Sequence, residues 1–583
     1  MLHTLSRSLR ENKGPALVTV LLSALEVVFE IVIPLFMSNL IDFGIEGGSM
    51  AAVWKFGAFL LLLAAFQLAT GVLAARIAAR ASVGFGANLR EDMYNNVQTF
   101  AFSNIDKFST ASIVTRLTTD VTNVQNAFQM LMRMAIRSPV MLVFSMIVSF
   151  RISRDISMTF LIILPILAVA LFFIIRSVFP VFSRVFRTYD ELNNVVQENV
   201  RGIRVVKSFN QERHEIGKFD AISARIYQDF SKGERLITLN APLMQSCIYA
   251  CMIIISWLGA KAIIASGNDP ALGLTTGNLT ALITYAMQIL SSLMMLSMVF
   301  AMLTISLSSA RRIAEVIEEK TDIQNPEHPI MAVRDGAIDF DHVSFVYASK
   351  ADKKVLDDID LHIHSGETIG VIGGTGASKS SLVQLIPRLY DVTGGKLTLG
   401  GVDVRDYDLD TLRGAVAMVL QKNELFSGTI AENLRWGNEN ATDEQLRHAC
   451  KLACADEFIS AMPDGYDTHI EQGGTNVSGG QKQRLCIARA LLKKPKVLIL
   501  DDSTSAVDTR TDAQIQQALS TYIPDTTKII IAQRISSVQN ADRIVVLDDG
   551  RINAVGSHDE LLRSCEIYRE VYESQQKGGE DDA

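Results

Sequence analysis

The amino-acid sequence predicts two domains of different class: an all-α domain of six transmembrane helices with long cytoplasmic helical extensions, followed by an α/β domain. Three observations support this prediction. The chain has 583 residues, which is too long for one hydrophobic core. Hydrophobic residues make up 48% of it and charged residues only 20%, and the apolar residues concentrate before residue 310. From Ala337 onward, short apolar strands alternate with helical segments.

The charge balance and the cysteines argue against two classes of function. The formal net charge is −8 and no basic cluster stands out, which argues against nucleic-acid binding. Two pairs of cysteines lie four residues apart, in helical patterns without neighbouring histidines. We therefore interpret the cysteines as buried thiols rather than metal ligands. The six are Cys247, Cys251, Cys450, Cys454, Cys486 and Cys565.

Six apolar segments predict the membrane helices. Most reach the ~20 residues needed to cross the hydrocarbon core of a bilayer. The third is shorter, but its helical pattern begins earlier, within residues 125–137. The first follows Arg7, Arg10 and Lys13 but is too long for a signal peptide, so we expect it to remain as a membrane helix. The segments are 16–41, 52–75, 138–150, 156–175, 241–264 and 278–310.

The connections between these segments predict the orientation of the chain. An even number of spans places both termini on one side of the membrane. The connections after the second and fourth spans have about sixty residues each, are rich in arginine and show helical periodicity. The positive-inside rule favours a cytoplasmic location for both. We therefore expect helices that continue into the cytoplasm, in a multi-pass protein of the cytoplasmic membrane with cytoplasmic termini and a cytoplasmic C-terminal domain.

Two carboxylates lie inside the first span. Glu26 and Glu30 are four residues apart, on one helix face, and are followed by Pro34, which is expected to kink the helix. A carboxylate in a bilayer is costly and usually faces a cavity or a partner. Three interpretations stay open: a site for a cationic substrate, a pair in which one carboxyl is held protonated by its neighbour, and a polar contact between helices.

The second half begins after a polar, proline-containing linker at 321–334. Residues 337–347 alternate apolar and polar side chains, which predicts a pair of strands. Residues 367–373 form a buried strand in this prediction. The continuous apolar runs at 496–502 and 528–533 are typical of a parallel sheet covered on both faces.

A glycine-rich turn follows the strand at 367–373, in VIGGTGASKSS at 371–381. Such a turn directs backbone N–H groups at an anion, so it predicts a phosphate-binding loop. In the pattern G-x-x-x-x-G-K-[ST], Lys379 would reach the β- and γ-phosphates and Ser380 would bind Mg²⁺. Ser378 stands where the pattern has its second glycine. The predicted cradle comprises Gly373, Gly374, Thr375, Gly376, Ala377, Ser378, Lys379, Ser380 and Ser381.

Two further sites accompany this loop. Asp501 ends an apolar strand and is placed to bind Mg²⁺ through water, the arrangement of P-loop ATPases. A second anion site is predicted where free N–H groups open a helix that is expected to begin near Lys482. Since one nucleotide cannot easily use both sites of one chain, we expect two chains arranged head to tail. The residues of the second site are Ser478, Gly479, Gly480 and Gln481.

Over nearly its whole length the chain resembles a half-transporter of the ABC exporter superfamily. The resemblance implies a transmembrane domain at 1–320, the linker at 321–334, an α/β P-loop ATPase domain (the ABC nucleotide-binding domain) at 335–573, and a polar tail at 574–583. Two segments, 106–117 and 198–209, are similar to the intracellular coupling regions of the family.

The resemblance also implies roles for single residues. Tyr347 matches the aromatic residue that stacks on adenine, and Gln421 matches the glutamine that senses Mg²⁺ and the membrane domain. VSGGQ at 477–481 matches the signature motif, which contacts the ATP of a partner chain. Asp508 ends the segment similar to the D-loop. ATP and Mg²⁺ are the implied cofactors.

Three residues depart from the family pattern. Asp502 replaces the catalytic glutamate and is one methylene shorter, and Gln533 replaces the switch histidine and cannot be protonated. Ser378 replaces a glycine. A positioned base contributes roughly 10²–10⁴-fold in rate, so we expect weak hydrolysis with ATP binding preserved. With its signature motif intact, the chain resembles the degenerate-site subunit of bacterial heterodimeric exporters.

The predicted function is one subunit of an ATP-driven exporter that moves amphiphilic or drug-like molecules out across the membrane. The expected partners are a second half-transporter, the lipid bilayer and the amphiphilic substrate, without nucleic acid. Two alternatives stay open. Asp502 could still act as the base in an active homodimer, or the chain could be a regulatory ATP-binding membrane subunit without turnover.

Overall fold

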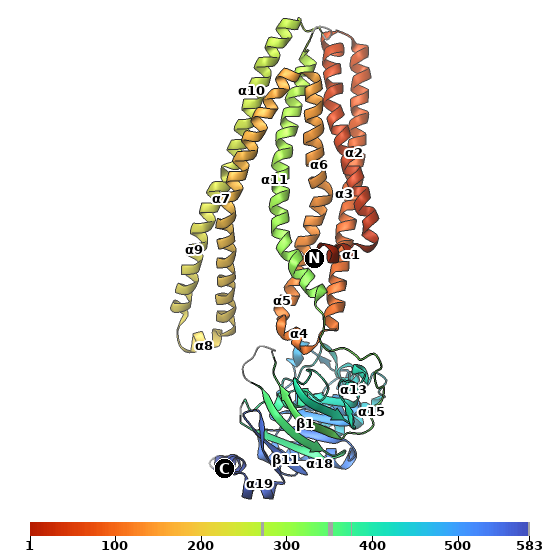
Figure 1. The fold of residues 1–583 in the computed structure, drawn as a ribbon, viewed down its shortest axis with the longest axis vertical. Coiled ribbons are helices and arrows are strands. Elements are labelled where there is room, and N and C mark those ends of the chain that lie inside the picture. The colour runs from red at the N-terminus through yellow and green to blue at the C-terminus, as the bar shows by residue number, and fades with distance from the viewer. Residues whose placement is uncertain (270–272, 348–353, 375, 581–583) are drawn as a thin grey trace. The chain divides into compact units, whose positions relative to one another are not determined.

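The computed structural model describes residues 1–269, 273–347, 354–374 and 376–580. By its internal contacts the chain divides into two units, which are described separately (Figure 1). The first contains Met1–Gln98 and Thr110–Glu319. The second contains Thr99–Ser109 together with the chain from Lys320 onward.

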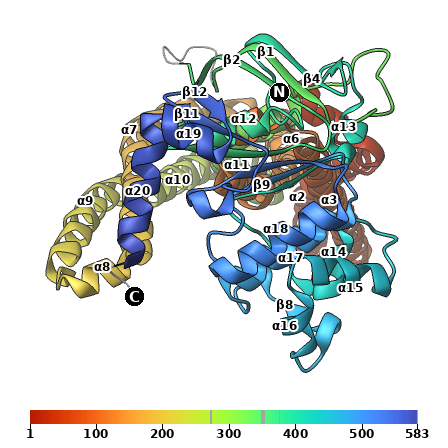
Figure 2. The same cartoon turned by 90° about the horizontal axis from the view of Figure 1, so that it is seen from below.

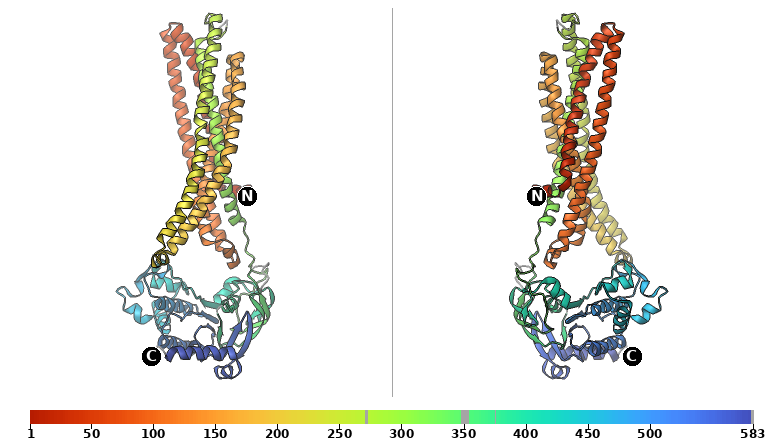
Figure 3. Two further views of the ribbon diagram at one scale, coloured as in Figure 1. Left: turned by 90° about the vertical axis from the view of Figure 1, so that its left-hand side faces the viewer. Right: turned by 90° about the vertical axis from the view of Figure 1, so that its right-hand side faces the viewer.

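The first unit is built from helices, which the side views in Figure 3 show as long rods coloured from red to green. Six helices among the described residues are long and apolar enough to span a membrane, which confirms the predicted number of spans. Their central elements are α2 (Lys13–Asn39), α3 (Met50–Gln98), α6 (Val121–Ile152), α7 (Arg154–Arg201), α10 (Asn240–Ser266) and α11 (Thr276–Glu318). Shorter elements join them: α1 (Leu2–Arg7), η1 (Arg10–Asn12), η2 (Leu40–Glu46), α5 (Thr110–Thr115), η3 (Arg116–Asp120), α8 (Ile203–Ser208) and α9 (Glu212–Thr238).

The predicted helical extensions are present. Helix α3 has 49 residues and α7 has 48. At ~1.5 Å per residue each is roughly 70 Å long, more than twice the ~30 Å thickness of the hydrocarbon core. Helix α6 begins at Val121, which confirms that the third span starts well before its apolar run.

Packing within this unit buries one face of most helices and leaves large apolar side chains exposed. Helix α11 packs on α6, and α2 packs on α3. One cluster joins α7, α10 and α11 through fully buried side chains such as Leu167, Ile255 and Ile289. Other large apolar side chains, such as Leu61 and Trp257, are exposed, as is typical of helices that face lipid.

The described residues of the second unit form three sheets. A six-stranded sheet has the order β12-β11-β3-β10-β9-β6, in which only the pairing of β11 with β12 is antiparallel. A four-stranded antiparallel sheet has the order β2-β1-β4-β5, and β7 pairs with β8. The strands are β1 (Ile338–Phe345), β2 (Leu356–Ile363), β3 (Thr368–Gly373), β4 (Gly394–Leu399), β5 (Val402–Asp403), β6 (Val416–Val419), β7 (Gly428–Thr429), β8 (His469–Ile470), β9 (Val497–Asp501), β10 (Thr527–Ile531), β11 (Arg543–Asp548) and β12 (Arg551–Gly556).

Helices complete this α/β unit. Helices α14, α15 and α17 pack together (Figure 2). The helices are α4 (Phe102–Lys107), α12 (Lys379–Gln384), α13 (Leu409–Ala415), α14 (Ile430–Arg435), α15 (Asp443–Leu452), α16 (Asp456–Ser460), α17 (Gly479–Leu492), α18 (Thr509–Tyr522), α19 (His558–Ser564) and α20 (Glu566–Glu580). Three short 3₁₀ turns are η4 (Gly465–Asp467), η5 (Gln472–Gly474) and η6 (Ile535–Ser537). The predicted fold class, an all-α membrane domain followed by an α/β domain, is confirmed.

Two local predictions need correction. Residues 337–347 were expected to form two strands, but they contribute one, β1, whose partners are β2 and β4. The reason is His342, whose φ of +47° produces a bulge in the strand instead of a turn. Helix α17 begins at Gly479 and not near Lys482, because Ser478 caps it. Helix α20 continues into the predicted polar tail as far as Glu580.

Candidate nucleotide-binding site

The glycine-rich loop joins β3 to α12. Gly373 ends the strand, and an added Cβ there would clash with the carbonyl oxygen of Leu547 on β11. Gly376 has a φ of +86°. Ser378 also adopts the left-handed conformation, with a φ of +65° and a ψ of +24°. A residue with a Cβ pays roughly 1–2 kcal/mol in this region, so the serine keeps the glycine's conformation under strain. Gly374 and Ala377 lie in the described part of the loop, and Thr375 lies outside the described residues.

Lys379 is the first residue of α12, and its side chain folds against the loop. Its Nζ donates to the carbonyl oxygens of Gly373 and Gly374, at 2.8 and 2.9 Å. Burial lowers the pKa of Lys379, and the nearby carboxylates of Asp501 and Asp502 oppose that shift. The ammonium group therefore lies at the loop backbone, where the sequence predicted a phosphate-binding lysine.

Two of the three residues predicted at the Mg²⁺ site, Ser380 and Asp501, lie together, and the third is Gln421. Ser380 hydrogen-bonds the carboxylate of Asp501, which ends β9 and is 4% exposed. Burial raises the pKa of Asp501, and the charge of Asp502 adds to the shift. No group of three metal-ligating side chains occurs among the described residues. A hydroxyl and one carboxylate fit Mg²⁺, which usually takes one or two protein oxygens and completes its shell with phosphates and water.

Tyr347 lies beside this loop and is 44% exposed. Its hydroxyl is 2.7 Å from the Oγ of Ser381. Its ring meets the ring of Tyr390 edge to face, with centroids 5.0 Å apart. Tyr390 in turn donates to the Oδ2 of Asp106 across 2.8 Å and packs on Phe102, both from α4. An aromatic chain therefore connects the predicted adenine-stacking residue with the first predicted coupling segment.

Asp502 follows Asp501 and lies between two amide side chains. The Nε2 of Gln533 donates to its Oδ2 across 2.9 Å, and the Nε2 of Gln421 lies 3.5 Å from the same oxygen. The backbone is fixed as well, because the Asp502 N–H donates to the carbonyl oxygen of Ile531 and its φ is +49°. Burial raises the pKa of Asp502, and the two amide hydrogen bonds oppose that shift. Residues from two other loops therefore converge on one oxygen of Asp502.

The signature segment opens α17. Ser478 is its N-cap and forms a reciprocal capping box with Gln481, whose Oε1 accepts from the Ser478 N–H across 2.9 Å. An added Cβ at Gly480 would lie 2.8 Å from the carbonyl oxygen of Ala506, so a glycine is needed for this close approach. Gln483 holds the same segment from the other side, with its Oε1 accepting from the Ala506 N–H across 3.0 Å.

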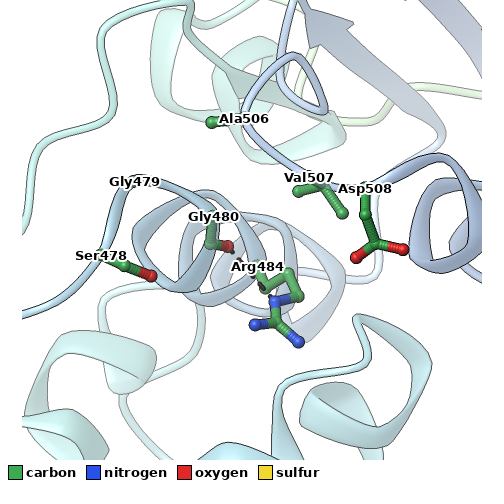
Figure 4. Close-up of a pocket in the computed structure, with 7 residues that line it drawn as sticks. All are labelled: Ser478, Gly479, Gly480, Arg484, Ala506, Val507 and Asp508. Atoms are coloured by element: carbon green, nitrogen blue, oxygen red, sulfur yellow. Dashed lines mark hydrogen bonds between the residues drawn. The ribbon is translucent and has the colours of Figure 1, made fainter. Parts of the chain in front are cut away.

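A hollow of about 320 Å³ lies at this helix start. Figure 4 shows that α17, with its cap, and the adjoining 506–508 segment supply all seven lining residues. Asp508 caps α18 by accepting from the Thr511 N–H, and this bond lowers the pKa of Asp508. The lining residues are Ser478, Gly479, Gly480, Arg484, Ala506, Val507 and Asp508.

The two carboxylates of the first span contact one arginine. Arg137 of α6 donates to the Oε1 of Glu26 and to the Oε2 of Glu30, at 2.8 and 2.7 Å. Glu26 is 8% exposed, and an added Cβ at Gly71 of α3 would lie 3.2 Å from its Oε1. Of the three interpretations left open, these contacts support the polar contact between helices. A role in binding a cationic substrate stays a prediction.

Four functional candidates were missed by sequence reasoning. Arg137 had a signal, because an arginine inside an otherwise apolar helix requires a partner. Gln483, Tyr390 and Gln575 had none, since their contacts join segments that are far apart or polar. Gln575, in the predicted polar tail, bonds the backbone on both sides of Arg534.

Comparisons with known proteins cover both units. Residues 16–294 match the family model described as the ABC transporter transmembrane region, and residues 356–505 match the model described as ABC transporter. An uncharacterized ABC transporter ATP-binding protein of Bacillus subtilis, YfiB, is 35% identical over 558 residues, covering 96% of each chain. An ATP-dependent lipid A-core flippase of Desulfotalea psychrophila is 32% identical over 475 residues, covering 80% of each chain. A solved bacterial Atm1-family ABC exporter with ATP bound shares the fold, with a TM-score of 0.79 at 24% identity, covering 97% of this chain and 98% of that one.

Proposed function

We propose a function on the premise that this chain belongs to the ABC transporter family, as an exporter half-transporter with a fused transmembrane domain and ATPase domain. It is a multi-pass membrane protein with a cytoplasmic ATPase domain. The proposal is that it works with a second half-transporter, that its own site binds ATP but hydrolyses it weakly, and that its signature segment completes the partner's site.

The position of Asp502 carries the proposal of weak hydrolysis. A general base needs a free oxygen directed at the attacking water, within hydrogen-bond reach. One of the two oxygens of the Asp502 carboxylate, Oδ2, already accepts from two amide donors, Gln533 and Gln421. Its side chain is also one methylene shorter than a glutamate, so it reaches less far from the strand end. Neither amide can accept or release a proton at neutral pH.

ATP binding does not depend on that base. Lys379 would hold the β- and γ-phosphates, and Ser380 and Asp501 would hold Mg²⁺, whose charge offsets that of the phosphates when it is bound. Tyr347, half exposed beside Ser381, offers a ring face to adenine. Gln421 and the loop glycines complete the proposed site. These residues retain the chemistry of a binding site although two hydrolytic positions are changed.

A second chain is proposed from two surfaces that are exposed in this one. The hollow at Ser478–Gln481 offers backbone N–H groups and the Arg484 side chain but contains no phosphate-binding lysine. In the second predicted coupling segment, helix α8 and the residue that follows it expose apolar side chains, including Val205 at 60% and Phe209 at 71%. A partner that carries the glutamate and histidine missing here would give a complex with one hydrolytic site and one binding site.

The proposed substrates are amphiphilic molecules. The relative named as a lipid A-core flippase acts, by that name, on a lipid, and it matches 80% of this chain. This supports a substrate that partitions into the bilayer, and lipids or lipophilic drugs satisfy this condition.

The experiment is an ATPase assay on the full-length chain, purified alone and with a co-expressed half-transporter that has the usual glutamate and histidine. Alone, the chain should bind ATP in a manner that Lys379→Ala abolishes, and hydrolyse little. In the complex, Gly480→Ala in this chain should lower hydrolysis at the partner's site, because the new Cβ meets Ala506. Rapid hydrolysis by the chain alone would support an active homodimer. A complex without ATP-dependent transport would support a regulatory subunit.

A further inference from the structure

The C-terminal helix α20 touches the turn that carries Gln533 through one side chain. The Nε2 of Gln575 donates to the carbonyl oxygen of Gln533 across 2.7 Å. Its Oε1 accepts from the N–H of Ile535 across 2.9 Å. One amide group therefore matches one carbonyl and one N–H, two residues apart, and bridges the backbone on both sides of Arg534.

The packing of α20 directs this side chain at the turn. Tyr568, Val571, Tyr572 and Gln575 recur at helical spacing, so they share one face. Tyr568 is fully buried, and its hydroxyl is 2.8 Å from the Nδ1 of His558 on α19. Val571 and Tyr572 pack against the same core. Gln575 lies about two turns beyond Tyr568, roughly 10 Å along a helix that the core already holds.

One end of the Gln533 turn is held by burial and a hydrogen bond, and the other end is exposed. At its C-terminal end, Ile535 is buried and the Oγ of Ser537 donates to the Oδ2 of Asp512 across 2.6 Å. At the other end, Gln533 and Arg534 are exposed. Gln575 supplies the side-chain hydrogen bond that fixes the carbonyl of Gln533, and the amide of Gln533 then contacts Asp502.

We propose that Gln575 is a positioning residue for the ATP site, which acts by fixing the Gln533 turn so that the Gln533 amide stays directed at Asp502. It does not touch the nucleotide itself. The proposal rests on the proposed function only in taking Asp502 and Gln533 as part of that site. In this proposal the C-terminal helix α20 contributes to the site, because the Gln533 turn stays ordered only while α20 packs against the core.

Loss of the contact has a measurable consequence. In Gln575→Ala the Gln533 turn loses two hydrogen bonds and becomes disordered, so nucleotide must reorder it on binding. A less preorganised site releases its ligand sooner. We expect nucleotide to dissociate about fivefold faster, the effect of roughly one net hydrogen bond. The measurement is stopped-flow release of a fluorescent methylanthraniloyl derivative of AMP-PNP, with Mg²⁺, from the full-length chain.

A double-mutant cycle separates positioning from general stabilisation. If Gln575 acts through Gln533, Gln575→Ala should have no further effect on the release rate once Gln533→Ala is present. Gln576→Ala is the matched control, because Gln576 is the next residue of α20 and, among the described residues, its side chain donates within the same helix, to Tyr572. It should release the probe at the wild-type rate.

A second variant guards against loss of folding. Gln575→Glu keeps the acceptor for Ile535 but removes the donor to Gln533, and it should also speed release. An unchanged release rate in both Gln575 variants, or equal acceleration with and without Gln533→Ala, overturns the inference. Because the probe is not hydrolysed, this outcome is independent of the ATPase assay. Rapid hydrolysis by the chain alone would overturn the proposed function and leave the cycle intact.

Discussion

The side-chain amide of Gln533 donates to the Oδ2 of Asp502 across 2.9 Å. This contact joins the end of β10 to the end of β9, two neighbouring parallel strands. It engages one oxygen of the Asp502 carboxylate, at the position where the family pattern has its catalytic glutamate. The two hydrolytic positions that depart from the ABC family pattern are therefore hydrogen-bonded to each other.

The strain at Ser378 gives the first prediction. Ser378→Gly should raise the Tm of the ATPase domain, because glycine adopts the left-handed conformation without the roughly 1 kcal/mol penalty of a Cβ. A gain of about 2–4 °C is expected. Ser378→Ala is the matched control and should give no gain, since alanine also has a Cβ. Equal Tm values for all three proteins in thermal unfolding would show that the loop carries no strain.

Asp501 gives a pH-dependent prediction. Its pKa is raised from 3.8 in the folded chain, so the folded state binds this proton more tightly than the unfolded state. The resulting stabilisation is present at low pH and is lost as the pH rises through the folded-state pKa. Asp501→Asn should therefore raise the Tm of the nucleotide-free protein at pH 7 by about 2 °C, and less at pH 4.5.

The same substitution should weaken Mg²⁺-dependent ATP binding, because it removes a negative ligand. Fluorescence titration with the labelled nucleotide, with and without Mg²⁺, measures this loss. Asp502→Asn is the comparison, since it changes the neighbouring carboxylate and should preserve the Mg²⁺ dependence.

For the pH-dependent stability of Asp501→Asn, a Tm gain at pH 4.5 as large as that at pH 7 would contradict the assigned pKa direction.

The contact between Tyr390 and Asp106 predicts how α4 is held. Tyr390→Phe keeps the ring contact with Phe102 but removes the hydrogen bond to Asp106. Hydrogen exchange of the amides of α4 should become about fivefold faster, the effect of roughly 1 kcal/mol. Tyr347→Phe serves as the control, because its hydroxyl contacts Ser381 and not α4. Unchanged exchange in Tyr390→Phe would mean that the hydrogen bond does not hold this helix.

The contacts of Arg137 predict that replacing one of its two glutamate partners costs little stability, whereas replacing both costs much more. Glu26→Gln leaves the Glu30–Arg137 pair in place and should be tolerated. Replacing both glutamates leaves a partly buried arginine without its counter-charge, which should destabilise the protein by about 3 kcal/mol. Adding Arg137→Met to the double variant should recover most of that loss.

Export of cationic dyes tests the alternative role of the two glutamates. If the two glutamates bind the cation, the triple variant should lose export although Arg137→Met restores its stability. If they serve only to join helices, the stable triple variant should export these dyes as the wild type does. Thermal unfolding in detergent gives the stability of each protein.

Much of the fold could be predicted from the sequence because its signals are local. Apolar runs define the six spans, and continuous apolar runs define β9 and β10. The start of α17 could also have been predicted, since Ser478 and Gln481 have the spacing of a capping box. The strand pair expected at 337–347 was wrong because a bulge and a turn look alike in an alternating pattern.

The hydrogen bonds around Asp502 and Gln533 could not be predicted from local sequence patterns. Gln533 and Asp502 are 31 residues apart, and Gln575 lies 42 residues beyond Gln533. Polar residues at such separations show no periodicity that would indicate their pairing. Asp502 and Gln533 were recognised as departures from a pattern, whereas their mutual hydrogen bond required the fold.

The most direct test of weak hydrolysis is phosphate release by the full-length chain in a single turnover of ATP, compared with the double variant Asp502→Glu/Gln533→His. In a dimer of two copies of the variant, the signature segment at Ser478–Gln481 of each chain would complete the site of the other. The account predicts that the variant releases phosphate about a hundredfold faster than the wild type, which binds ATP equally well. A wild-type chain that itself releases phosphate rapidly, as fast as an active variant, would contradict it.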